Sequence, residues 1–180
     1  MSTYFNQSTR DIVSQFHFGE HVETTGGVLV AANFTNPAQT ELFNIYGRIG
    51  IKQLFIELTS AADANITTVA FNRTFTTPVI ALNTMQAASA SIASLGAYSR
   101  ITFVGGVVAT APVITDSAGL TDVEAAGKIH ILGGVSAAGV LTVGTIGMAT
   151  AGGTQAATIA ATAHLYYVPM CSGAYATAVL

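Results

Sequence analysis

The clearest candidate for chemistry in this 180-residue chain is the segment His17-Phe18-Gly19-Glu20-His21, where two histidines stand four residues apart with an acid between them. On a helix, the two imidazoles would share a face and could hold a metal ion. Gly19 and the neighbouring phenylalanines disfavour a helix, the HExxH pattern is absent, and the sequence offers no evident third ligand. We therefore expect a polar stretch here and predict no metal site.

The other groups able to do acid–base or nucleophilic chemistry lack the setting that catalysis needs. His130 and His164 stand inside strand-like runs, which favours strand residues with a satisfied ring nitrogen. Cys171-Ser172-Gly173 is the nearest approach to a nucleophile elbow, but no strand–turn–helix pattern surrounds it. No glycine-rich phosphate loop is present either.

Carboxylates gather in one loop-like segment that contains Asp116, Asp122 and Glu124. Acid-rich loops can bind calcium, but the ligand spacing of an EF-hand is missing, and a solvated loop is the simpler interpretation. The sequence thus predicts no catalytic residue, no cofactor-binding residue and no enzyme.

Charged residues are unusually scarce. They make up 8% of the chain, six of them basic and nine acidic, whereas hydrophobic residues make up 51%; about 25% charged residues is typical of a soluble domain. So few charges cannot cover the exterior, so we expect a surface partly of uncharged polar residues and partly buried by other subunits. The basic residues form no run, which argues against nucleic-acid binding.

The single cysteine, Cys171, excludes an internal disulfide, and the N-terminus shows no secretory signal. We therefore expect synthesis in a reducing cytosol. Residues 129–180 contain no Lys, Arg, Asp or Glu, but Gly133-Gly134 and Gly152-Gly153 interrupt the segment. Glycine pairs and β-branched residues fit strands better than a membrane-spanning helix, so we predict no membrane insertion.

After Gly26-Gly27, the chain is a succession of short strand-like runs separated by Gly and Pro. The runs are 28–32, 41–46, 48–58, 66–71, 79–82, 101–108, 128–132, 140–148 and 157–168. Strands at this spacing predict a single all-β domain over residues 26–180, an antiparallel β-sandwich or a barrel. The one helical candidate, Met85–Leu95, also suits a polar strand or loop.

The run 48–58 changes its pattern part-way. Ile49 and Ile51 alternate with polar residues, but Leu54 and Ile56 fall on the parity of the earlier polar positions. This switch indicates either a β-bulge near Gln53 or burial of both faces.

Residues 1–25 differ in texture from the rest, and show no sustained helical or strand period. They contain four aromatic residues that could bind a partner: Tyr4, Phe5, Phe16 and Phe18. Two interpretations are open, a loosely ordered polar tail and an extended arm that docks these aromatics on a neighbouring subunit. We favour the arm.

Two stretches carry a resemblance to a known class of proteins. Thr40–Leu58 followed by Asn65–Val69, and Ala163–Met170 followed by Gly173-Ala174, resemble the small Ala/Gly/Thr-rich β-proteins of tailed phages, including capsid decoration or cement proteins. The resemblance implies a jelly-roll-like, commonly trimeric domain on the capsid surface of the virion, made in the host cytoplasm. Its implied partners are the major capsid protein and other copies of the chain.

Two other functions stay open. One is a different virion component, such as a head fibre base or a tail or baseplate module. The other is a carbohydrate-binding adhesin, for which Tyr98 and Tyr175 are the loop-like aromatics that could stack on a sugar.

Overall fold

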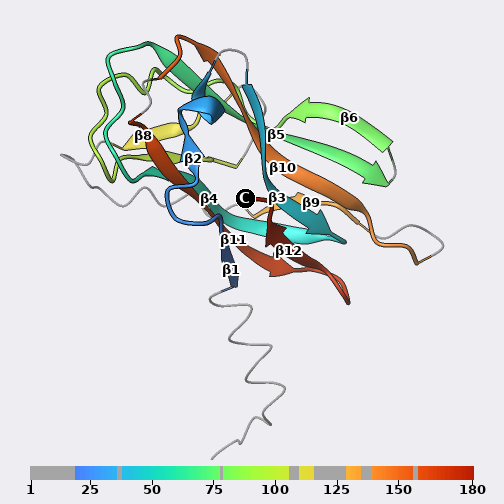
Figure 1. The fold of residues 1–180 in the computed structure, drawn as a ribbon. Coiled ribbons are helices and arrows are strands. Elements are labelled where there is room, and N and C mark those ends of the chain that lie inside the picture. Colours follow the sequence, from blue (N-terminus) through green and yellow to red (C-terminus); the bar gives the residue numbers. More distant parts are fainter. Residues whose placement is uncertain are drawn as a thin grey trace, which may run out of the picture.

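The computed structural model describes residues 19–35, 38–77, 79–105, 110–115, 129–134, 139–155 and 158–180. Over these ranges the chain is an all-β sandwich of two antiparallel sheets (Figure 1), in agreement with the fold class that the sequence predicts. The only helical element among the described residues is the 3₁₀ turn η1 (Ala31–Phe34). No helix in the described ranges is long and apolar enough to cross a membrane.

Among the described residues, the larger sheet has seven strands and the smaller has five. The larger sheet follows the order β1 (Glu20–Glu23), β11 (Ala160–Pro169), β4 (Ile49–Leu58), β7 (Arg100–Thr102) and β8 (Val113–Thr115), with β2 (Leu29–Val30) also paired to β11 and β9 (His130–Leu132) to β4. The smaller sheet follows the order β12 (Tyr175–Ala178), β3 (Ala38–Tyr46), β10 (Val143–Gly152), β5 (Thr67–Thr77) and β6 (Val79–Thr84).

The core lies between the two sheets. Leu54, Ile56 and Leu165 face inward from the larger sheet, and Phe43 and Phe71 from the smaller one, all of them fully buried. Burial of each such side chain contributes about 1.5–3 kcal/mol relative to exposure, so this layer is the main source of stability.

The uncharged segment 129–180 supplies a central strand to each sheet. β10 lies between β3 and β5, and β11 lies between β1 and β4. A central strand is covered by neighbours on both edges, and most residues of β10 and β11 are buried or half-buried. Charged side chains would be costly there, which explains much of their absence from this part of the chain.

The predicted irregularity in 48–58 is a β-bulge. Tyr166 pairs with Gln53 but Tyr167 pairs with Ile51, so Lys52 is an extra residue on β4. Both faces of β4 also carry buried residues, with Ile49, Gly50 and Ile51 buried in succession. Both interpretations of the parity switch, a β-bulge and burial of both faces, therefore apply to β4.

Several boundaries differ from the prediction. Met85–Leu95 is not a helix but an irregular segment along the edge of β5, where the Ser89 and Ile92 amides donate to carbonyl oxygens of that strand. The strand predicted at 28–32 is cut short by η1. Of the predicted run 101–108, only residues 101 and 102 lie in a described strand, β7. The short strands β1, β8 and β12 were missed.

The boundary of the predicted arm also needs correction. Residues 20–23 form β1, which pairs with β11, and the Thr24 amide continues the pairing by donating to the Ala163 carbonyl. Residues 20–25 therefore belong to the sandwich. Residues 1–18 lie outside the described residues.

Candidate functional site

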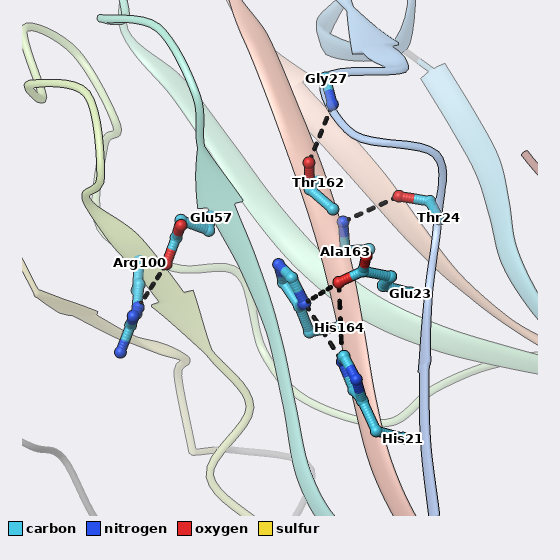
Figure 2. Close-up of polar contacts among 9 residues, drawn as sticks. All are labelled: His21, Glu23, Thr24, Gly27, Glu57, Arg100, Thr162, Ala163 and His164. Atoms are coloured by element: carbon cyan, nitrogen blue, oxygen red, sulfur yellow. Dashed lines mark hydrogen bonds and ion pairs between the residues drawn. The ribbon is translucent and has the colours of Figure 1, made fainter.

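Two histidines and a glutamate meet on the outer face of the larger sheet. His21 and Glu23 are two residues apart on β1, so their side chains leave the same face of the strand. On β11, His164 pairs with Glu23 and Tyr166 pairs with His21, which places all four side chains together. We call His21, Glu23 and His164 the His–Glu cluster; Figure 2 shows its two rings and its carboxylate converging.

The polar atoms of the His–Glu cluster are close to one another. Glu23 Oε2 is 3.1 Å from His164 Nδ1 and 3.8 Å from His21 Nε2. The two ring nitrogens are 3.3 Å apart, and which of them donates depends on the tautomer. The side chains of His21 and Glu23 are 37% and 53% exposed and that of His164 is 16% exposed, so solvent reaches the cluster from one side.

Aromatic stacking holds both imidazoles in place. The His21 ring stacks on Tyr166 with centroids 4.3 Å apart, and the His164 ring stacks on Phe55 of β4 at 4.7 Å. The two imidazoles are nearly parallel, with an interplanar angle of 8°. Because each ring rests on a neighbour fixed by strand pairing, few alternative rotamers remain for either histidine.

An ion pair borders the cluster on the β4 and β7 side. Arg100 Nε donates to Glu57 Oε2 at 2.7 Å, and its guanidinium lies over the Phe55 ring with Cζ 5.2 Å from the ring centroid. The Phe55 ring thus contacts both the His164 ring and the Arg100 guanidinium. Figure 2 shows the Arg100–Glu57 pair beside the His–Glu cluster. Glu57 forms its ion pair with Arg100, whereas Glu23 is the acid that contacts the two imidazoles.

Burial lowers the pKa of His164 below its usual value. Glu23 and Glu57 act in the opposite direction, whereas His21 and Arg100 add to the lowering. A lowered pKa keeps this imidazole neutral near pH 7, the form that offers a lone pair.

Hydrogen bonds from backbone amides to threonine hydroxyls lie next to the cluster and hold residues 24–27 against β11. The Ala163 amide donates to Thr24 Oγ1 at 3.0 Å, and the Gly27 amide donates to Thr162 Oγ1 at 2.9 Å. Thr24 is fully buried, and both contacts appear in Figure 2 above the two imidazoles. The register that brings His21 and Glu23 to His164 is therefore locked by side-chain as well as strand hydrogen bonds.

His21 and His164 were both considered from the sequence, but no sequence pattern brings them together. A helical pairing of His21 with His17 was considered from the sequence and disfavoured; His21 lies in strand β1, and His17 lies outside the described residues. Glu23 was not among the sequence candidates. Its spacing from His21 indicates a shared strand face only once residues 20–23 are recognised as a strand.

The remaining candidates from the sequence are dispersed or undescribed. The aromatic residues Tyr4, Phe5, Phe16 and Phe18 and the acids Asp116, Asp122 and Glu124 lie outside the described residues, so their predicted roles stay predictions. Cys171 lies between β11 and β12, and its sulfur accepts a hydrogen bond from the Arg48 amide at 3.2 Å. Of the two loop-like tyrosines, Tyr175 is in β12 and not in a loop.

His130 lies away from the cluster and points toward the core. It pairs with the buried Ile51, and its ring meets Phe103 edge-on at 5.3 Å. Its Nε2 is buried without a hydrogen-bond partner among the described residues, so the predicted satisfied ring nitrogen is not found there. Burial and, secondarily, the Arg73 charge lower the pKa of His130.

A second feature of the outer face is apolar. Ile131 pairs with Gly50 on β4, and Ile129 and Met170 lie directly over that glycine, at 2.6 and 3.0 Å from the position a Cβ atom would take. We call these three residues, Ile129, Ile131 and Met170, the apolar patch. Their exposed fractions are 50%, 52% and 42%, respectively. The outer face of the larger sheet thus carries the polar His–Glu cluster and the apolar patch at separate places along β4 and β11.

Comparison of the chain with models of protein families, with curated proteins and with solved structures gave no match.

Proposed function

We propose that this chain is a structural subunit of a virus particle, a capsid decoration protein of a tailed phage that binds the outside of the head and stabilises it. The observation that carries the proposal is the apolar patch. Three large apolar side chains stand together on an outward-facing sheet surface, in a chain with only six basic and nine acidic residues. Exposed contiguous apolar surface on a folded domain marks a place for a partner.

The fold suits this role for physical reasons. A sandwich with central strands covered on both edges is rigid, and it presents broad faces without needing a catalytic pocket. Specific protein interfaces bury about 1,600 Å² in total, so the apolar patch would be the centre of a larger contact. The resemblance of Thr40–Leu58 and Ala163–Met170 to phage structural proteins points to the major capsid protein and to other copies of the chain as partners.

The test is cosedimentation with phage heads together with light scattering of the free protein. We expect a homotrimer that pellets with heads built from the major capsid protein of the same genome and raises their temperature of heat disruption. Ile131→Asp should weaken head binding by at least about tenfold, because a charge would be buried in the contact. Ile66→Asp is the matched control, since Ile66 is 68% exposed on the loop before β5 and outside the apolar patch.

Two results would overturn the proposal. One is a protein that stays monomeric and never pellets with heads. The other is equal binding by the Ile131→Asp and Ile66→Asp variants, which would separate the apolar patch from attachment.

An adhesin is the second candidate, because exposed aromatic side chains are on the surface. Tyr98 is 64% exposed, and Tyr175 stacks on Tyr46 with centroids 4.4 Å apart while remaining 44% exposed. Sugar rings stack on such faces. Retention on a glycan array that is lost in Tyr98→Ala or Tyr175→Ala would favour this function over the capsid role.

A further inference from the structure

We propose that the His–Glu cluster is a binding site for a divalent transition-metal ion, with Zn²⁺ as the ion it fits best. The ligand atoms would be His21 Nε2, Glu23 Oε2 and His164 Nδ1. This proposal rests on the geometry of β1 and β11 alone and does not depend on the proposed capsid role. It also departs from the sequence analysis, which predicted no metal site.

The spacing of the three atoms is the first argument. Zinc binds imidazole nitrogen at about 2.0–2.1 Å and carboxylate oxygen at about 2.0–2.2 Å, in tetrahedral geometry. Two corners of such a tetrahedron lie about 3.3–3.5 Å apart by geometry from those bond lengths. The three distances here are 3.1, 3.3 and 3.8 Å, so the atoms already stand at three corners of a zinc-sized tetrahedron.

The donor types are the second argument. Two imidazoles and one carboxylate suit zinc and its first-row neighbours, whereas calcium and magnesium take sets composed of oxygen. Three protein ligands leave the fourth corner to water, and the partial exposure of His21 and Glu23 gives the ion a path from solvent.

Preorganisation is the third argument. The stacking of His21 on Tyr166 and of His164 on Phe55 holds the rings before any ion arrives. Strand pairing sets Glu23 opposite His164, so the three ligand side chains are already gathered and binding would need only tilting of the two rings toward the ion. A bound ion would clamp β1 to β11 and hold the end of the N-terminal segment on the sandwich.

The experiment is calorimetric titration of ZnCl₂ into the full chain after chelator treatment, in a buffer that does not bind zinc. We expect one zinc ion per chain with a dissociation constant of about 1 μM or below. His21→Asn, Glu23→Gln and His164→Asn should each weaken binding by at least about tenfold, since even loss of a supporting contact costs that much in metal sites. Zinc should also raise the Tm of the wild-type chain by more than it raises the Tm of any of these three variants.

Two matched variants test whether the ligand set is the one assigned. Glu57→Gln removes a carboxylate on the same sheet face that is paired with Arg100, and it should bind zinc within about twofold of wild type. His17→Asn removes the histidine four residues before His21 and should leave zinc affinity unchanged. Substitution with Co²⁺ should give the intense visible absorption of a tetrahedral site.

Three outcomes would overturn the proposal. The first is absence of saturable zinc binding to the wild-type chain at about 100 μM, well above the expected dissociation constant. The second is weak binding of several ions that the three ligand variants do not reduce. The third is loss of binding in His17→Asn with binding kept in His164→Asn, which would move the site to the N-terminal segment.

Discussion

At the scale of single residues, one phenol joins the two sheets. The Tyr167 hydroxyl on β11 donates to Glu20 Oε2 at 2.5 Å and accepts from the Ala176 amide on β12 at 3.1 Å. Burial and the bond to Glu20 raise the pKa of Tyr167 to about 12, so this hydroxyl stays protonated at all moderate pH values. It is a permanent polar link between the edge strands β1 and β12.

Removal of that hydroxyl should destabilise the sandwich. In Tyr167→Phe, the buried Ala176 amide loses its acceptor, and we expect a loss of about 1–3 kcal/mol in the free energy of unfolding. Urea unfolding measures this loss in the free energy of unfolding. Tyr98→Phe is the control, because Tyr98 is exposed and its variant should stay within about 0.5 kcal/mol of wild type. Equal stability of the two variants would show that the Tyr167 link contributes nothing.

A second residue-scale prediction concerns pH. Because the folded-state pKa of His130 is lowered, the unfolded chain binds a proton more readily than the folded one. The contribution of His130 to stability is therefore unpenalised above its unfolded pKa of about 6.5 and becomes unfavourable as the pH falls through that value. His130→Phe removes this titration and also the buried Nε2 that has no partner among the described residues.

We expect the stability of His130→Phe relative to wild type to improve when the pH falls from about 8 to about 5.5, as measured by urea unfolding. His164 titrates in both proteins, so its contribution cancels in the difference. A difference in stability that does not change with pH would mean that His130 has the same pKa in the folded and unfolded chain.

At the scale of elements, the two sheets are joined where the β3–β4 turn crosses the segment between β9 and β10. Thr142 Oγ1 accepts from the Gly134 amide at 2.7 Å and lies 3.1 Å from the Gly47 carbonyl, while the Gly47 amide donates to the Thr142 carbonyl at 2.7 Å. Gly133 comes so close to this crossing that a Cβ atom would collide with the Gly47 carbonyl oxygen.

Two glycines in the same conformation separate backbone strain from collision. Gly133 and Gly139 have φ of +75° and +76°, but a Cβ on Gly139 would meet nothing within 4 Å. Gly139→Ala should therefore cost only the left-handed conformation, about 1–2 kcal/mol. Gly133→Ala adds a steric clash and should cost about 2–5 kcal/mol. Thermal unfolding compares the stabilities of the two variants. Equal losses of stability would mean that the backbone around Gly47 shifts without cost to accommodate the added Cβ atom.

How much of these elements the sequence could predict depends on the range of the interactions that form them. The long strands follow from local alternation of apolar residues and were predicted, and the bulge near Gln53 was one of the two interpretations of the parity switch in β4. The short strands β1, β8 and β12 have too few residues to show a period, and β1 exists because β11 offers it an edge. Met85–Leu95 is rich in helix-favouring alanine, but its amides are taken by carbonyl oxygens of β5.

The same reasoning explains why the candidate site was not predicted, although two of its residues were considered. His21 and His164 are 143 residues apart, and only the order of strands β1, β11 and β4 brings them onto one face. Strand order depends on long-range packing that a local pattern does not encode. The histidine types were therefore visible from the sequence, whereas their partnership and the role of Glu23 were not.

At the scale of the whole molecule, the N-terminal boundary of the sandwich decides what a truncation experiment means. Val22 of β1 and Ala178 of β12 are partly buried and pack against the core, so β1 is part of the sandwich. Removal of residues 1–18 should leave the sandwich folded, and any loss of attachment to a partner would then report on the predicted arm. Removal of residues 1–25 takes away β1 as well, and would confuse loss of the arm with damage to the fold.

The chain without residues 1–25 should be less stable than the chain without residues 1–18, because it loses specific hydrogen bonds. Without residues 19–25, the Ala163 amide loses Thr24 Oγ1, the Ala163 carbonyl loses the Thr24 amide, and Tyr167 loses Glu20. At about 1 kcal/mol for each bond, the shorter chain should be at least about 3 kcal/mol less stable, besides the exposure of the β11 edge. Urea unfolding of both truncated chains measures the difference. Equal stability would place the start of the sandwich after residue 25, where the sequence had put it.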